Sequence, residues 1–353
     1  MSVVEKRGCY YAVIYVDGKQ RWLAAGKSKK KAQALHDEWL VKSRRGELQI
    51  PKAITFAEFS ELWITDYCEV KLKPVTIKEY RGYLKKYLIP AFGRMKMTAI
   101  RPEHIQRHVS QLVKEGRLKP KSIKNQMVPM KRIFALAIQW GYANQNPAEH
   151  LALPRIENPE IPFLAPEQMR ELIEATDPEW KSLIALACMC GMRKGECLGL
   201  TWDNVLWEEG FINVRQSLWN GALQTPKTKK SIAKIPMPRT VEAMLMERMT
   251  ISPASEMNLV FCRKDGSPLR QEYVNFRIMK SALAKSGLPK VTFHGLRHSF
   301  VAAHIAQGTP MKVIQELARH SSIQTTLDRY GHLLPDSKED AAKKLEDVMW
   351  GTD

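Results

Sequence analysis

The sequence lacks most of the motifs that metal and nucleotide chemistry requires. It contains no glycine-rich Walker loop, no His-Glu-x-x-His and no cluster of Asp and Glu suited to two divalent ions. Its six cysteines are scattered, and no Cys-x-x-Cys pair recurs at zinc-finger spacing. We therefore expect no metal and no cofactor, and any phosphodiester chemistry should proceed without either.

Long apolar segments are also missing. The longest apolar run, residues 183–192, is too short to span a bilayer and is followed by Arg193. Cys188 and Cys190 lie inside this run, where small core side chains explain them better than a metal site does. The N-terminus shows no stretch typical of a secretory signal, so we expect a cytoplasmic protein without a membrane partner.

Acidic residues are in deficit. The chain of 353 residues has 37 Asp and Glu against 55 Lys and Arg, which gives a net charge of +18. Such an excess favours a polyanionic partner, because each basic residue placed on a phosphate releases condensed counterions. Nucleic acid is the first expectation, and an anionic membrane surface is the alternative.

The first fifty residues predict a small basic unit. Residues 8–25 alternate in strand fashion around an Asp17-Gly18 turn, and a helix is expected over about 29–44. The charges that make this unit a candidate for DNA backbone contact include Lys29, Lys30 and Lys31. A solvated helix face explains any single one of these lysines equally well.

A helical segment follows a linker at 46–54. Thr55 caps a helix with apolar positions at spacings of three and four, and further helices are expected at about 75–89, 102–115 and 121–140. Breaks are expected at Pro90 and at later prolines and glycines. These helices predict a four-helix bundle over 54–152, and its candidate DNA contacts are Lys121, Lys124 and Arg132.

The remainder, after a proline-rich linker at 153–166, predicts a mixed α/β unit that is mainly helical, over 160–353. We expect helices at about 167–175, 179–190, 194–200, 239–248, 271–286, 295–307, 310–317, 322–329 and 337–349, and strands near 211–217 and 231–236.

Three fragments of this last unit carry side chains suited to phosphate chemistry. They are Gly191-Met192-Arg193-Lys194-Gly195-Glu196, His294-Gly295-Leu296-Arg297-His298, and the late stretch from Leu317-Ala318-Arg319-His320 to Tyr330. Each fragment alone could serve the fold. Together and in this order they resemble the tyrosine recombinase family, of the phage integrase type.

The resemblance implies a set of catalytic residues. They are Arg193, Lys227, His294, Arg297, His320 and Tyr330, with Glu196 as a supporting residue that orients Arg193 or a neighbouring lysine. Lys227 stands in a Lys-Thr stretch that looks like the family's hairpin, where Lys229 and Lys230 are close competitors.

The chemistry agrees with that set. Attack on a phosphodiester builds negative charge on its non-bridging oxygens, which two guanidinia bind by bidentate hydrogen bonds. The Tyr330 phenol, with an ordinary pKa of about 10, needs such a positive pocket and help from His294 or His320 to attack near neutral pH. Lys227 would protonate the leaving 5′-oxygen.

The resemblance also implies an architecture and partners. We expect a multidomain chain with an arm-type DNA-binding domain at 1–50, a helical core-binding domain at 54–152 and a catalytic domain at 160–353. The first would be a small three-stranded sheet plus helix. The partner is double-stranded DNA, bound by a homotetramer in which the C-terminal segment docks on a neighbour, with an excisionase or host DNA-bending protein as a further partner.

Arg319 departs from the family pattern, which usually has glycine before the second histidine. It could be a strained substitute or a contact to a DNA phosphate, and neither account makes it catalytic. On either account Arg319→Gly keeps or raises the cleavage rate. Two rival functions are a type IB topoisomerase and a non-catalytic DNA-binding relative.

Overall fold

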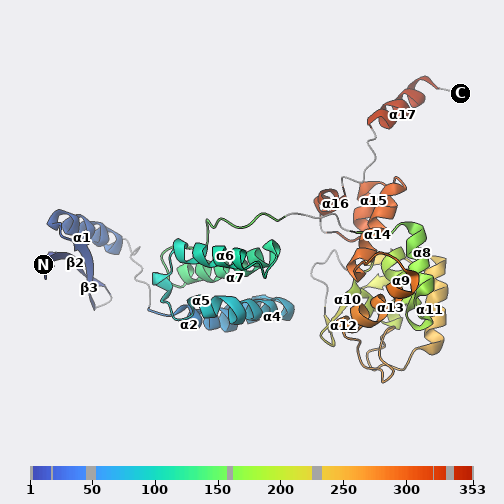
Figure 1. Ribbon diagram of the computed structural model, residues 1–353, viewed down its shortest axis with the longest axis horizontal. Coiled ribbons are helices and arrows are strands. Elements are labelled where there is room, and N and C mark those ends of the chain that lie inside the picture. Colours follow the sequence, from blue (N-terminus) through green and yellow to red (C-terminus); the bar gives the residue numbers. More distant parts are fainter. Residues whose placement is uncertain are drawn as a thin grey trace. The chain divides into compact units, whose positions relative to one another are not determined.

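The structure is a computed structural model that describes residues 3–16, 19–44, 53–156, 162–224, 233–320, 322–330 and 338–351. The chain divides into two compact units, Met1–Asn158 and Pro159–Asp353. Most of the described residues are helical and the sheets are small, as the sequence predicted (Figure 1). The finer domain limits at 50, 54, 152 and 160 remain predictions.

The first unit begins with a three-stranded antiparallel sheet of order β1-β2-β3. Its strands are β1 (Val3–Lys6), β2 (Cys9–Val16) and β3 (Lys19–Gly26), and helix α1 (Lys29–Arg44) packs on the sheet. The alternating pattern predicted the pair β2–β3, whose Asp17-Gly18 turn lies outside the described residues. The alternating pattern began at residue 8 and so did not predict β1, which is joined to β2 by Arg7 and Gly8, both at positive φ.

The rest of this unit consists of helices around one apolar core. Thr55 caps α2 (Phe56–Leu62) in a reciprocal arrangement with Glu58, as its sequence position predicted. The other helical segments are a π turn (Trp63–Cys68), α3 (Glu69–Lys71), α4 (Pro74–Tyr83), a π turn (Leu84–Leu88), α5 (Ile89–Phe92), a 3-10 turn (Met97–Ala99), α6 (Pro102–Glu115) and α7 (Pro120–Gln139). The largest buried side chains of this core are Phe56, Phe59, Trp63 and Phe134.

The prediction that Pro90 ends a helix is wrong. The helix that begins with α4 passes through the π turn Leu84–Leu88 and continues through Pro90 to Phe92. Pro90 cannot donate a backbone hydrogen bond, but the wider π turn before it makes room for its ring, so the helix continues.

The second unit is built around α9 (Lys181–Met189), whose residues 182–188 are all buried. Cys188 and Cys190 are 2% and 4% exposed, so they are core side chains. Burial raises the pKa of Cys190 to about 12. In the described part of the chain, no three His, Cys, Asp or Glu residues are placed to hold a metal ion.

Two small sheets lie beside these helices. β4 (Val205–Leu206), β5 (Phe211–Val214) and β8 (Ala233–Pro236) form one antiparallel sheet of order β4-β5-β8. β6 (Ser217–Trp219) and β7 (Ala222–Gln224) form a hairpin through Asn220-Gly221, both at positive φ. The sequence predicted one strand over 211–217, because the Asn-Gly turn signal was not used.

The remaining helices carry most of the candidate site. They are α8 (Pro166–Ala175), 3-10 turns (Pro178–Trp180 and Trp202–Asn204), α10 (Lys194–Leu198), α11 (Arg239–Ile251), α12 (Gln271–Tyr273), a π turn (Val274–Met279), α13 (Lys280–Ser286), α14 (Phe293–Ala306), α15 (Met311–Leu317), α16 (Ile323–Tyr330) and α17 (Lys338–Trp350). α9 packs against α8, α11 and α14. None of the described helices is long and apolar enough to cross a membrane.

Candidate active site

Arg193, Arg297 and Tyr330, which are far apart in the sequence, meet at one place in the second unit. Arg193 is the N-cap of α10, Arg297 lies on α14, and Tyr330 ends α16. Thr292 starts α14, because its hydroxyl accepts a hydrogen bond from the Gly295 N–H at 3.0 Å. That cap sets the register that brings Arg297 to the buried side of the helix.

Arg193 is held by the first turn of its own helix. Its Nη1 donates to Glu196 Oε1 at 2.7 Å, and its backbone N–H donates to Glu196 Oε2 at 2.9 Å. Its Nη2 donates to the backbone oxygen of Arg319 at 3.2 Å. The side chain remains 36% exposed, so it can still bind an anion arriving from solvent.

Arg297 lies beneath Arg193 and is 2% exposed. Its Nη1 donates to the Gly191 carbonyl and its Nη2 to the Ala318 carbonyl. Burial first, and then the charges of Arg193 and Arg319, lower the pKa of Arg297 to about 9. It is therefore still largely protonated at neutral pH.

Glu196 is the acidic group at the centre of these arginines and is 4% exposed. Burial would raise its pKa, but the charges of Arg319 and Arg193 outweigh burial, and the pKa lies below its ordinary value. Glu196 is therefore ionised. Its expected role in orienting Arg193 fits this geometry and stays a proposal.

Arg319 is buried beside Glu196. Its side chain is 1% exposed, and its Nη2 donates to Glu196 Oε2 at 2.6 Å. Its φ is 51°, a left-handed conformation that costs a non-glycine residue about 1–2 kcal/mol. The left-handed conformation that the sequence suggested is present. The expected contact of Arg319 with a DNA phosphate stays a prediction.

Tyr330 is 3% exposed, and its hydroxyl is hydrogen-bonded to Nδ1 of His298. His298 is 6% exposed and lies one residue beyond Arg297 on α14. The rings of His298 and His294 meet edge to face with centroids 4.6 Å apart. His298 was missed as a candidate. The signal for it is the second histidine of His294-Gly295-Leu296-Arg297-His298, one helical turn after the first.

The other two expected catalytic residues are His320, which the structure describes, and Lys227, which it does not. His320 follows Arg319 in the loop after α15 and is half-buried, and its backbone N–H donates to the Gln315 carbonyl at 3.0 Å. Lys227 lies outside the described residues, as do Lys229 and Lys230. The lysine of the site therefore stays a prediction.

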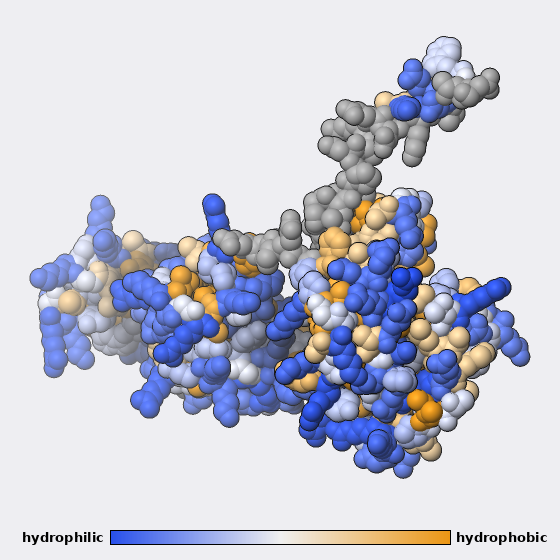
Figure 2. Space-filling model, turned by 45° about the vertical axis from the view of Figure 1, so that its right-hand side comes forward, coloured by the Kyte–Doolittle hydropathy of each residue, from blue (hydrophilic) through white to orange (hydrophobic). Residues whose placement is uncertain are grey.

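The other expected DNA contacts lie in the first unit. Lys29, Lys30, Lys31, Lys121 and Arg132 are exposed, and Lys124 is half-buried. The Arg132 guanidinium lies 5.7 Å from the centroid of the Tyr80 ring. Hydrophilic side chains cover much of the described surface seen in Figure 2. These positions are compatible with backbone contacts to DNA, which remain a prediction.

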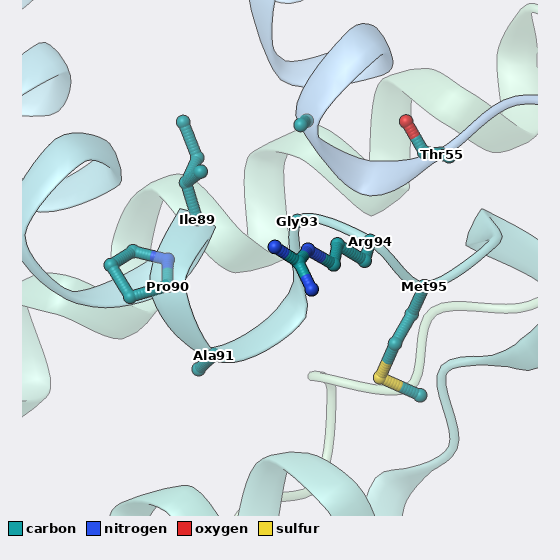
Figure 3. Close-up of a pocket in the computed structure, with 8 residues that line it drawn as sticks. Thr55, Ile89, Pro90, Ala91, Gly93, Arg94 and Met95 are labelled. Atoms are coloured by element: carbon teal, nitrogen blue, oxygen red, sulfur yellow. The ribbon is translucent and has the colours of Figure 1, made fainter.

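A cavity of about 610 Å³ in the first unit offers no comparable chemistry. It is lined by Thr55, Ala57, Ile89, Pro90, Ala91, Gly93, Arg94 and Met95 (Figure 3). Of these eight residues only Arg94 is charged, and none supplies a carboxylate, an imidazole or a thiol. This cavity therefore does not compete with the cluster around Arg193 and Tyr330 as a candidate active site.

Comparison with known proteins identifies the family. The phage integrase family matches residues 162–336, and the N-terminal SAM-like domain of phage integrases matches residues 55–113. A XerC-like tyrosine recombinase of Caldanaerobacter subterraneus is 28% identical, over 92% of this chain and 91% of that protein. The ICEBs1 integrase of Bacillus subtilis is 27% identical, over 84% of each.

Solved structures share the fold. The Tn1549 transposon integrase in complex with a circular intermediate DNA superposes with a TM-score of 0.72 at 22% identity, over 83% of this chain and 99% of that one. A lambda integrase tetramer bound to a Holliday junction gives a TM-score of 0.62 at 17% identity, over 91% of this chain and 96% of that one. Because two family models and curated relatives along most of the chain agree, the chain belongs to the phage integrase family of tyrosine recombinases.

Proposed function

We propose that this enzyme cuts DNA with Tyr330 and rejoins it to another strand, integrating and excising a mobile element. One observation carries the proposal. The Tyr330 phenol, hydrogen-bonded to His298, lies in the same site as the buried guanidinium of Arg297 and the partly exposed guanidinium of Arg193. The ICEBs1 and Tn1549 integrases among the relatives support a mobile element as the substrate.

In the first step the Tyr330 oxygen attacks the phosphorus, and the bond from phosphorus to the 5′-oxygen breaks. The products are a 3′-phosphotyrosine and a free 5′-hydroxyl, which takes a proton that Lys227 would supply. Arg193 and Arg297 bind the two non-bridging oxygens as their negative charge increases. His298, whose Nδ1 is hydrogen-bonded to the Tyr330 hydroxyl, accepts the phenol proton, and His294 and His320 are the other candidates for this role.

In the second step a 5′-hydroxyl from another strand attacks the phosphotyrosine and releases Tyr330. The ester keeps the energy of the original phosphodiester, so no nucleotide cofactor is consumed. The same chemistry without strand exchange would be that of a type IB topoisomerase. Integration and excision require the exchange.

A covalent-trapping experiment tests this function. A nicked substrate carrying the junction sequence of the element, from which the 5′ fragment diffuses away, should accumulate a protein–DNA adduct in excess EDTA. We expect the same adduct yield with EDTA and with Mg²⁺, because the proposed step uses only side chains of this chain. Strict dependence on Mg²⁺ would contradict the mechanism, and relaxation of supercoils on DNA without any such site would favour the topoisomerase.

The three-part organisation remains part of the proposal. Residues 1–50 would bind arm-type sites, residues 54–152 would contact the core site, and residues 160–353 would carry the chemistry. The helical and sheet elements of the first unit support this division. Because the proposed substrate is DNA of a bacterial host, we propose that the enzyme acts in the cytoplasm.

Removal of residues 1–50 should separate binding from cleavage. We expect cleavage at the core site to persist and high-affinity binding to distant arm sites to be lost, as measured by gel shift on each DNA separately. The triple variant Lys29→Ala, Lys30→Ala and Lys31→Ala should lower the slope of log K against log salt for arm DNA by about 2–3, since each phosphate contact contributes about 0.9. Unchanged arm affinity after the truncation would contradict the assignment.

Assembly on DNA is proposed to be a tetramer formed through α17. This helix presents Leu345, Met349 and Trp350 at 60%, 63% and 78% exposure. Apolar side chains on a helix of this kind favour docking on a neighbouring subunit. An excisionase or a host DNA-bending protein would set the direction of the reaction.

A further inference from the structure

Arg319 brings a third arginine to the two that are proposed to bind phosphate. It lies in the loop after α15, where the family usually has glycine, and its side chain is 1% exposed. Its backbone φ of 51° is strained for arginine. A buried charge at a strained position is retained when its surroundings fix it there, and the contacts of Arg319 do so.

The Arg319 side chain connects two loops. Its Nη2 donates to Glu196 Oε2 at 2.6 Å and to the Gly191 carbonyl at 3.5 Å, and its Nη1 donates to the Leu317 carbonyl at 3.3 Å. Its backbone oxygen accepts from Arg193 Nη2 at 3.2 Å. Among the residues that the structure describes, its Nε has no hydrogen-bond partner. The loop before α10 and the loop after α15 are thus joined through one residue.

The two oxygens of Glu196 are divided between two arginines. Oε1 accepts from Arg193 Nη1 at 2.7 Å, while Oε2 accepts from Arg319 Nη2 at 2.6 Å. A buried carboxylate with a single arginine partner would attract the whole fork of that arginine. Because Arg319 neutralises one side of Glu196, Arg193 contributes only Nη1 to the carboxylate. Its Nη2 donates to the Arg319 carbonyl, and the remaining N–H groups of the guanidinium stay available for a phosphate.

The charges of the site point the same way. Arg193, Arg297 and Arg319 face one ionised Glu196, which leaves an excess of two positive charges among these four groups. With glycine at 319 the excess would be one. The excess acts most strongly in the transition state, where the negative charge on the non-bridging oxygens increases and burial limits screening by solvent.

We propose that Arg319 is a positioning residue, which holds Glu196 so that Arg193 presents its outward N–H groups to the scissile phosphate. This inference rests on the proposed function of Arg193 and Tyr330. It replaces the expectation that Arg319→Gly keeps or raises the cleavage rate. Arg319 itself touches neither the DNA nor the nucleophile.

Single-turnover cleavage at saturating DNA tests the role. Arg319→Gly relieves the backbone strain but removes the charge, and Arg319→Met keeps the length of the side chain. We expect both to lower the rate 10–100-fold with less than a threefold change in DNA Kd. Arg319→Lys keeps the charge beside Glu196 and should lose less than tenfold. A rate kept or raised in Arg319→Gly, or equal losses in the Lys and Met variants, would overturn the role.

The pH profile separates positioning from a merely structural effect. Four titratable groups surround Glu196. They are Arg193 at the start of the same helix, Arg297 on α14, Arg319 in the loop after α15, and the neighbouring Cys197, whose thiol stays protonated. Loss of Arg319 removes the neighbour that most lowers the pKa of Glu196. The acidic limb of the rate should therefore move to higher pH in the Gly and Met variants and stay in place in the Lys variant. An unmoved limb in all three would count against the inference.

A double variant tests whether Arg319 acts through Glu196. In a Glu196→Gln background, Arg319→Met should add less than a threefold loss, and a full further loss would show that Arg319 acts elsewhere. Melting temperatures of all variants exclude unfolding as the cause. Wild-type enzyme must first form the Tyr330 adduct. Its failure to do so would contradict the proposed function, whereas an adduct with unaffected Arg319 variants contradicts only the positioning role.

Discussion

Tyr330→Phe is expected to abolish covalent attachment to DNA while leaving DNA binding within about twofold of wild type. The substitution removes one oxygen, which is the proposed nucleophile, and keeps the ring that packs with Phe300, Val301 and Ile314. Its structural cost is one hydrogen bond to His298, about 1 kcal/mol. Denaturing gel electrophoresis of the trapped complex measures the adduct, and gel shift measures binding.

Tyr273→Phe is the matched control for that variant. Tyr273 lies in the same unit, is 41% exposed and packs edge to face on Trp180. It should form the adduct at the wild-type rate. An adduct that resists denaturation in the Tyr330→Phe protein would assign the nucleophile to another residue.

Arg193→Lys should reduce single-turnover cleavage about 10²–10³-fold, equivalent to about 2.7–4 kcal/mol of transition-state stabilisation. Arg193 donates through Nη1, Nη2 and its backbone N–H. It is also the arginine of the site that solvent reaches. A lysine ammonium cannot hold Glu196 and the Arg319 carbonyl while also presenting two donors to a phosphate. The substitution keeps the charge, so binding to DNA should change little.

Arg170→Lys gives the corresponding control. Arg170 lies on the surface of α8, pairs loosely with Glu174 at 3.9 Å and is 76% exposed. Its replacement should leave cleavage within about twofold, because exposed pairs contribute little. If Arg193→Lys cleaved as fast as this control, charge alone would suffice at position 193 and the bidentate contact would be refuted.

The helices were the most predictable part of the fold. Helices α6 and α7 begin at Pro102 and Pro120 and were predicted within one residue of their observed limits, because proline at a first helical turn marks a boundary. Pro90 was interpreted as a boundary in the same way, but that prediction was wrong because the π turn before it lets the helix continue. Periodicity detects the average of 3.6 residues per turn and does not reveal one wider turn.

The candidate site was predictable where spacing within one helix determines it. Arg193 and Glu196 stand three residues apart at a helix start, so their contact follows from local geometry. The contact of His298 with Tyr330 depends on how α14 packs against α16, and burial decides between His294 and His298. Arg319 shows the same limit. Its departure from the family pattern was visible, but its pairing with Glu196 joins residues 123 positions apart.

Gly191 gives the arginine cluster a consequence for protein engineering. Its carbonyl accepts from both Arg297 and Arg319, its φ is 58°, and an added Cβ would lie 2.6 Å from the Phe300 ring. No other residue type fits there without displacing that ring. A designer who transplants Arg319 into a relative must therefore carry Gly191, Glu196 and Phe300 with it as one cassette. Without these residues, the transplanted arginine would be a buried cation that lacks its hydrogen-bond and ion-pair partners.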